Sequence, residues 1–196
     1  MILDNNYWYF EKALSQSTVN MIIDICEKEK KKQAEVNVGN ASVDKSKRDC
    51  IVSFTNNKDI YDIINPYINT ANKNADWNFQ IDWNEDCQYT IYNKSQFYGY
   101  HTDTFTKPYE SEEETFNGKI RKLSMTVQLT DQSEYEGGDF YFKYLKPNGV
   151  IEEKVNKAKG VGTIIIFPSF VYHQVTPVTK GTRKSLVCWT LGKPFK

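Results

Sequence analysis

The sequence predicts an α+β fold in which helices near the N-terminus pack against one face of a later β-structure. Two observations predict it. Apolar residues before residue 80 recur at helical spacing, whereas after Trp83 apolar and polar residues alternate with a period of two. Helices first and strands later are typical of an α+β chain. The number of predicted strands suits a double-stranded β-helix, also called a jelly roll.

The composition is that of one soluble globular domain, with 39% apolar and 26% charged residues among 196. The 25 basic and 25 acidic residues cancel, so charge gives no reason to expect nucleic acid or anionic lipid as a partner. No apolar run is long enough for a membrane span, and the first residues lack the segments of a signal peptide. We therefore expect a single cytoplasmic domain over residues 1–196, with no membrane partner.

The four cysteines have neither paired nor metal-type spacing. They are Cys26, Cys50, Cys87 and Cys188. Cys26 lies on an apolar helical face and Cys188 in an apolar strand, so we expect buried, inert thiols. A reducing compartment fits this pattern.

The first 80 residues are expected to form an N-terminal helical support. An aromatic cluster at residues 7–10 predicts a strand or arm packed on the body. Ser15 or Ser17 can cap a first helix. Its apolar residues follow at helical spacing: Val19, Ile22, Ile23 and Cys26. Residues 39–49 are small and charged, which predicts a mobile loop.

A strand is predicted at residues 50–54, followed by a second helix that begins near Asn57. Pro66 must either kink this helix or mark a fresh helical start. The core over about residues 85–192 is then rich in strands. Further strands are predicted at residues 89–92, 123–130, 140–142, 150–155, 161–167 and 185–191, with a turn at 147–149.

The chain has only two histidines, His101 and His173. In an extended strand, side chains two residues apart share a face, so His101 and Asp103 are expected to converge. Two imidazoles and one carboxylate form the facial triad of non-heme Fe(II) oxygenases, which leaves coordination positions open. A His-x-Asp motif alone is common by chance. Together with His173, which follows an apolar run at residues 164–168, it predicts a metal site.

Arg183 lies ten residues after His173. Lysines outnumber arginines by 22 to 3, so an arginine at this position is notable. The guanidinium can hold a carboxylate through two parallel hydrogen bonds. The alternative, a surface ion pair, fits less well because Leu186 and Val187 place this arginine in an apolar strand.

Three blocks give the chain a wider resemblance: residues 92–103; residues 129–131 with the glycine pair Gly137-Gly138 before a strand; and residues 167–189. In these blocks the chain resembles the Fe(II)- and 2-oxoglutarate-dependent dioxygenases. It is most similar to the prolyl 4-hydroxylase-like branch with its bacterial and phage relatives. The resemblance covers about residues 85–192 and also implies the jelly-roll fold. A structural role is expected for the glycine pair.

The resemblance implies that His101, Asp103 and His173 are the catalytic Fe(II) ligands. It implies 2-oxoglutarate and O2 as cosubstrates, ascorbate as an accessory reductant, and hydroxylation of a substrate C–H with release of succinate and CO2. Arg183 is then expected to bind the distal carboxylate of 2-oxoglutarate, with Tyr92 donating to the same group. Ser185, two residues after Arg183, shares its strand face and can add a hydroxyl donor.

The substrate implied by the resemblance is a proline in a peptide or protein segment. Tyr98, Tyr100 and Trp189 are expected to line its pocket, because proline-rich segments dock on aromatic-lined grooves. Each of these aromatics can instead fill the core. The alternatives are hydroxylation of a small molecule or another side chain, a metal-dependent cupin enzyme that does not use 2-oxoglutarate, and a non-catalytic jelly-roll binding module.

Two neighbouring activities are disfavoured. Asp103 occupies the position where related halogenases carry a small residue, and Trp189 the position where nucleic-acid demethylases carry a second arginine. The acidic stretch at residues 104–118 follows the metal motif directly, and predicts either a solvated loop or a lid over the site.

Overall fold

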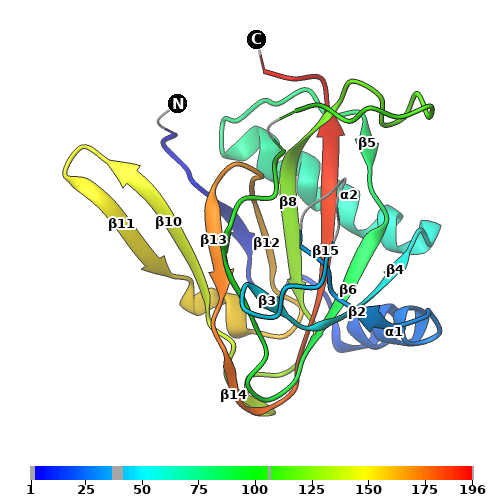
Figure 1. The fold of residues 1–196 in the computed structure, drawn as a ribbon, viewed down its shortest axis with the longest axis vertical. Coiled ribbons are helices and arrows are strands. Elements are labelled where there is room, and N and C mark those ends of the chain that lie inside the picture. The colour runs from blue at the N-terminus through cyan, green and yellow to red at the C-terminus, as the bar shows by residue number, and fades with distance from the viewer. Residues whose placement is uncertain (1–2, 37–41, 106, 196) are drawn as a thin grey trace.

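The computed structural model describes residues 3–36, 42–105 and 107–195. Its fold is a double-stranded β-helix in which two antiparallel sheets face each other, and two helices cover the outer face of the larger sheet (Figure 1). The predicted fold class is confirmed. No helix in the described part of the chain is long and apolar enough to cross a membrane.

The larger sheet runs in the order β1-β12-β8-β15-β6-β4-β2, and the smaller one in the order β11-β10-β13-β7-β3. The larger sheet contains β1 (Trp8–Phe10), β12 (Ile164–Pro168), β8 (Ile120–Gln128), β15 (Arg183–Gly192), β6 (Cys87–Tyr92), β4 (Ile51–Thr55) and β2 (Lys32–Gln33), with β5 (Trp83–Asn84) paired to β15. The smaller sheet contains β11 (Gly149–Lys154), β10 (Phe140–Lys146), β13 (Tyr172–Val175), β7 (Phe97–His101) and β3 (Arg48–Asp49). Strands β9 (Tyr135–Gly137) and β14 (Val178–Gly181) form a separate pair, and a short 3-10 helix, η1, spans Asn156–Lys159.

Helix α1 (Gln16–Glu27) begins where Ser15 accepts a hydrogen bond from the backbone N–H of Thr18. Helix α2 (Lys58–Asn74) is capped by Asn57 and continues through Pro66. Of the two alternatives for this proline, the fresh helical start is therefore wrong. Because proline has no backbone N–H, the carbonyl of Asp62 lacks its usual hydrogen bond within the helix. Both residues are exposed, so water can donate to that carbonyl instead.

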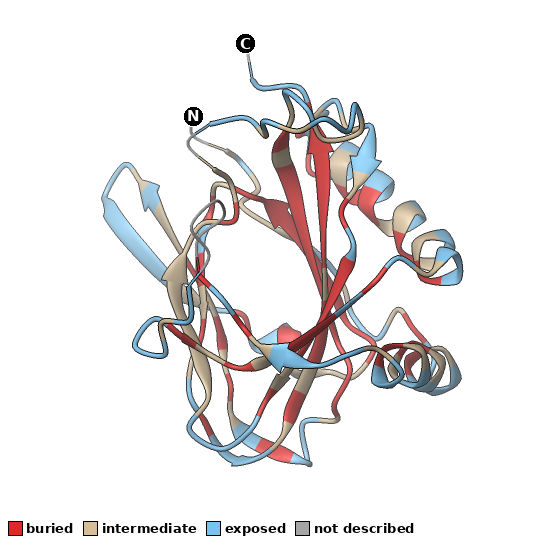
Figure 2. Cartoon of the chain, turned by 45° about the vertical axis from the view of Figure 1, so that its right-hand side comes forward, coloured by how far each residue is buried: buried red, intermediate tan, exposed pale blue. Residues whose placement is uncertain are grey.

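Two hydrophobic cores lie on opposite sides of the larger sheet, and β12 contributes to both. Ile164 and Ile166 pack under the helices, whereas Ile165 and Phe167 point between the two sheets. The run of apolar residues in β12 therefore records burial on both faces. Figure 2 shows the central strands of the larger sheet almost entirely buried.

Hairpin β10–β11 projects from the body of the molecule, and most of β11 is exposed (Figures 1 and 2). The mobile loop expected at residues 39–49 is wrong at its end, because Arg48 and Asp49 form β3 and Arg48 is buried. Residues 39–41 of that prediction lie outside the described ranges. The four cysteines are free and buried, as expected.

Candidate metal centre and active-site cleft

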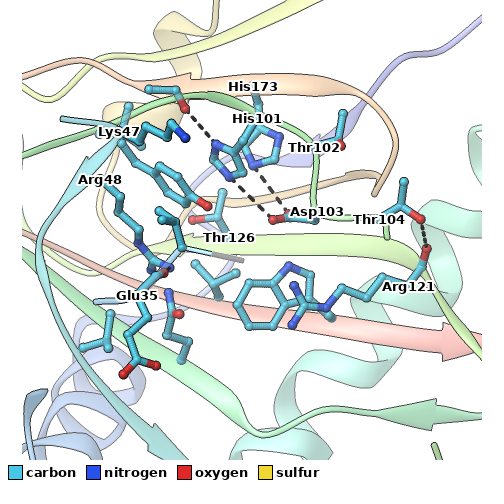
Figure 3. A pocket seen from close by; sticks show the side chains of 18 of the residues that line it. Glu35, Lys47, Arg48, His101, Thr102, Asp103, Thr104, Arg121, Thr126 and His173 are labelled. Atoms are coloured by element: carbon cyan, nitrogen blue, oxygen red, sulfur yellow. Dashed lines mark hydrogen bonds and ion pairs between the residues drawn. The ribbon is translucent and has the colours of Figure 1, made fainter. Parts of the chain in front are cut away.

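The two histidines lie opposite each other on neighbouring strands, because His173 on β13 pairs with His101 on β7. Ligand atoms of His101, Asp103 and His173 all lie within 4.8 Å of one another. The Asp103 carboxylate faces both rings, with Oδ1 3.5 Å from His101 Nε2 and Oδ2 3.4 Å from His173 Nε2 (Figure 3). The structure thus brings the three predicted ligands together.

The physical reason given above for the convergence of Asp103 is wrong. Strand β7 ends at His101, so Asp103 lies beyond the strand and does not follow its alternation. Instead the backbone N–H groups of Asp103 and Thr104 both donate to the carbonyl of Ser169, at 2.8 and 3.0 Å. This contact ties the turn after β7 to the segment just before β13.

Each histidine of the triad is oriented by a backbone carbonyl. Nδ1 of His101 lies 2.8 Å from the carbonyl oxygen of Gly99, and Nδ1 of His173 lies 3.0 Å from that of Val171. A carbonyl only accepts, so Nδ1 carries the proton in both rings. The lone pair of each Nε2 therefore faces the space beside Asp103, as a metal ligand requires.

The protonation states of the buried pair also suit a cation. Burial, and after it the neighbouring His101, lower the pKa of His173 to about 4, although Asp103 opposes the shift. For Asp103, burial alone would raise the pKa, but His173 and His101 outweigh it and the pKa is lowered. At neutral pH the carboxylate is ionised and His173 is neutral, which leaves both groups ready to bind metal.

The metal-free protein is expected to lose stability as the pH falls from about 6.5 towards 4. His173 has a folded-state pKa of about 4, below its unfolded value of about 6.5. Its contribution to the free energy of unfolding is therefore complete above about pH 6.5, and it is lost at lower pH because the unfolded state binds a proton that the folded state does not. At about pH 4.5 we expect a loss on the order of 2 kcal/mol from this residue. Urea unfolding of the wild type and of His173→Gln at about pH 7 and 4.5 measures it. An identical pH dependence of the unfolding free energy in the two proteins would contradict the lowered pKa of His173.

A second polar group of the cleft lies where β15 begins. Arg183 pairs with Tyr92 of β6, is 3% exposed, and donates from Nη1 to the Ser185 hydroxyl at 3.3 Å. Its guanidinium makes no ion pair with any described carboxylate. Gly138 has a positive φ of 55°, and a Cβ there would lie 2.9 Å from Arg183 Cδ, so a larger residue would displace the arginine. The predicted trio of Arg183, Tyr92 and Ser185 is therefore assembled.

The three aromatics predicted for the pocket have different positions. Tyr98 stacks on the ring of His101 with centroids 3.5 Å apart, and Trp189 lines the cleft with a buried Nε1–H that has no partner among the described residues. Tyr100 also borders the cleft, but its hydroxyl donates to Glu152 on β11. Trp189 therefore keeps a donor that no described residue accepts.

Sequence reasoning missed Arg121 on β8. Its guanidinium lies 3.8 Å from the centroid of the Trp189 ring and donates to both carboxylate oxygens of Glu85, at 2.6 and 2.5 Å. Tyr109 donates to the same carboxylate at 2.8 Å. The scarcity of arginine was the available signal, because all three arginines of the chain line the cleft.

The stretch at residues 104–118 is attached to this cleft by its first half. Phe105 and Tyr109 pack edge to face at 5.2 Å and both line the cleft, whereas Glu112–Glu114 are exposed. The second half is thus solvated, as the loop alternative predicts, and a lid formed by the first half stays a prediction. Together with the triad and the arginines, these residues enclose a cleft of 1380 Å³.

A family model described as the 2OG-Fe(II) oxygenase superfamily matches residues 87–191, which is more than half of the chain. The chain belongs to this superfamily. The matched segment includes the triad, Arg183 and Trp189. The family expected from the sequence motifs is thereby confirmed.

Curated relatives within the superfamily include PKHD-type hydroxylases. One from Alteromonas mediterranea is 37% identical over 98 residues, covering 50% of this chain and 39% of the relative. Another, from Picosynechococcus, is 34% identical over 101 residues, covering 52% of this chain and 39% of the relative. The matched segment thus spans about two-fifths of the length of these relatives.

Solved structures of superfamily members confirm the fold. A Pseudomonas putida prolyl-4-hydroxylase matches with a TM-score of 0.68 at 17% identity, over 95% of this chain and 93% of that one. A Trichoplax adhaerens prolyl hydroxylase, solved with a hypoxia inducible factor peptide fragment, matches with a TM-score of 0.64 at 14% identity, over 95% and 84% of the two chains. At such identities the likeness concerns the fold alone.

Proposed function

We propose that this superfamily member is an Fe(II)- and 2-oxoglutarate-dependent hydroxylase that acts on a peptidyl proline. The observation that carries the proposal is the convergence of two imidazoles and one carboxylate, with ligand atoms within 4.8 Å of one another, in a cleft that also holds a buried arginine. The proposed catalytic core covers about residues 85–192, supported by about residues 1–80, in one domain.

The donor set fits ferrous iron. Two imidazoles and one carboxylate on one side of an ion are the facial triad of non-heme Fe(II) oxygenases, and they leave the other side open. His101, Asp103 and His173 would hold the ion. When bound, the iron supplies the activation of O2 that a protein side chain cannot perform. The residues supply its position, through the carbonyls of Gly99 and Val171 that fix the two rings.

The buried guanidinium of Arg183 fits the cosubstrate. Arg183 lacks a carboxylate partner among the described residues and already has its fork oriented by Ser185. A dicarboxylate such as 2-oxoglutarate would give this guanidinium its missing anion. Burial raises the pKa of Tyr92, so its hydroxyl stays protonated and can donate to the same carboxylate. The turnover of 2-oxoglutarate to succinate and CO2, with ascorbate as reductant, belongs to this proposal.

A proline-containing segment suits the other side of the cleft. Tyr98, Trp189 and Arg121 line the cleft beside the triad, and proline-containing segments dock in aromatic-lined clefts of this kind. Structural neighbours named as prolyl hydroxylases, one of them solved with a peptide, support the same substrate class.

A small-molecule substrate is the second candidate. The cleft floor carries buried polar side chains, among them Gln88 and Thr126, which a polar metabolite could use. A non-catalytic binding module would be expected to have lost a ligand or Arg183, and this chain keeps both.

Iron-loaded protein with 2-oxoglutarate is expected to form succinate and to add one oxygen to proline-containing peptides. Mass spectrometry of the peptides and a succinate assay measure the two products separately. Succinate formation that peptides do not stimulate, with turnover of a free metabolite, would favour the second candidate. The absence of succinate with every substrate would contradict the oxygenase proposal.

A further inference from the structure

The three arginines of the cleft differ in what neutralises them. Arg121 forms a bidentate ion pair with Glu85, and Arg183 is proposed to bind the carboxylate of 2-oxoglutarate. Arg48, on β3, is 8% exposed and forms no ion pair with any described residue. None of the residues outside the described ranges has an acidic side chain that could supply one. A buried guanidinium without an anion is costly and calls for an explanation.

The protein holds the Arg48 side chain in place but uses only part of its hydrogen-bonding capacity. Nε donates to Cys50 Sγ at 3.3 Å, and Nη1 donates to the backbone carbonyl of Glu35 at 3.2 Å. Nη2 has no partner among the described residues. The Glu35 carboxylate is engaged by Lys32 at 3.4 Å instead. A guanidinium has five N–H donors in a fixed fork, so most of them stay free for a ligand.

The place of Arg48 connects it to the reacting centre. Its guanidinium carbon lies 4.4 Å from the centroid of the Tyr98 ring, and the same ring stacks on His101 with centroids 3.5 Å apart. The Tyr98 ring therefore contacts both Arg48 and a residue of the triad. In Figure 3, Arg48 and Arg121 reach into the cleft from opposite sides of the triad, and Arg48 lies on the side of Glu35.

The electrostatics of the cleft point to the same kind of ligand. The whole chain carries 25 basic and 25 acidic residues. Among the lining residues, however, six are lysine or arginine and three are aspartate or glutamate. Even with Arg121 neutralised by Glu85, the lining keeps an excess of positive charge, which favours anionic ligands.

We propose that Arg48 binds an anionic group of the substrate, so that this enzyme selects substrates with a carboxylate close to the carbon that is hydroxylated. This inference rests on the proposed hydroxylase function. The carboxylate can be an Asp or Glu side chain next to the target residue of a peptide, or the free carboxylate of a small acid. Both would form the same paired, charge-assisted hydrogen bonds to the guanidinium.

A competing explanation is that Arg48 helps to bind 2-oxoglutarate, because Tyr92 lies near both arginines. The contacts favour the substrate. Arg183 is oriented by Ser185 at the start of β15, whereas Arg48 is oriented by the carbonyl of Glu35, a residue whose own side chain is 41% exposed. The two guanidinium groups therefore have separate supports, and only Arg48 is held by a residue whose side chain reaches solvent.

The test measures binding to the Mn(II)-loaded protein with N-oxalylglycine, an unreactive 2-oxoglutarate analogue, and again without metal. The probes are three proline peptides that differ only in Glu, Gln or Lys beside the proline, together with free L-proline and L-prolinamide. We expect wild type to bind the carboxylate member of at least one series roughly tenfold more tightly than its neutral counterpart. The peptide series and the proline pair distinguish the two sources of the carboxylate.

The variant Arg48→Gln should remove this preference and leave the affinity for 2-oxoglutarate unchanged. Lys45→Gln is the matched control, because it removes one charge from the same segment at an exposed position outside the cleft. If Arg48→Gln melts at a much lower temperature, Arg48→Lys keeps the charge without the fork and should give a reduced preference.

The proposal is overturned if carboxylate and neutral probes bind wild type equally, including no measurable binding of either, or if the preference survives in Arg48→Gln. It is also overturned if that variant weakens 2-oxoglutarate binding and leaves the probe preference intact. A carboxylate preference in a protein that forms no succinate would instead support the Arg48 site and reject the oxygenase function.

Discussion

Replacing His173 with alanine is expected to abolish iron binding and substrate hydroxylation. The change removes one of three ligand groups, and the remaining pair, His101 and Asp103, leaves the ion held from one strand end only. Metal analysis and a succinate assay on the purified variant measure the two losses. A folded His173→Ala protein with full iron occupancy would refute the assignment.

The stability of this variant must be measured alongside. His173 is 6% exposed and packs against Phe140 and Phe167, so its removal leaves a cavity. We therefore expect alanine to cost on the order of 1–3 kcal/mol of folding free energy. His173→Gln keeps more of the volume and should lose iron with a smaller cost.

A neighbouring variant controls for general damage to β13. Gln174→Ala changes the next residue, whose side chain points to the opposite face of the sheet, towards Tyr100. Iron content and 2-oxoglutarate turnover should both stay at the wild-type level in this protein.

Replacing Arg183 with lysine is expected to raise the apparent KM for 2-oxoglutarate by roughly five- to a hundred-fold, equivalent to about 1–3 kcal/mol. Lysine keeps the charge but loses the planar fork that Ser185 orients. Because position 183 is almost fully buried, water cannot replace the hydrogen bond to the carboxylate that is lost with the guanidinium fork. Steady-state succinate formation at varied 2-oxoglutarate measures the change.

The next residue provides the matched control. Lys184 points away from the cleft and contacts Glu27 of α1 at 3.2 Å, so Lys184→Gln should leave the 2-oxoglutarate dependence unaltered. An unchanged KM in Arg183→Lys would move the anchor to another donor, with Tyr92 and Ser185 the next variants to test.

The sequence by itself determined the fold class and the members of the triad. Residues 123–130 alternate strictly, and apolar residues around Ile60 and Ile64 recur at helical spacing, so local periodicity was enough to place strands and helices. His101 and His173 followed because the chain has only two histidines, and Arg183 because arginine is rare in it. Asp103 was named from its place two residues after His101, although the strand geometry assumed for it does not extend that far.

Only the tertiary structure decided which charges are paired. Glu85 and Arg121 are 36 residues apart and meet across the sheet, and nothing in the local pattern of either segment indicates the other. Arg48 looked like part of a charged loop, yet β3 pairs with β7 and buries it against Tyr98. Periodicity records which face a side chain takes, but the partner on that face depends on chain segments brought together by folding. The same reason explains why Asp103 lies beside the two histidines: its backbone N–H donates to the Ser169 carbonyl, a contact that no strand alternation predicts.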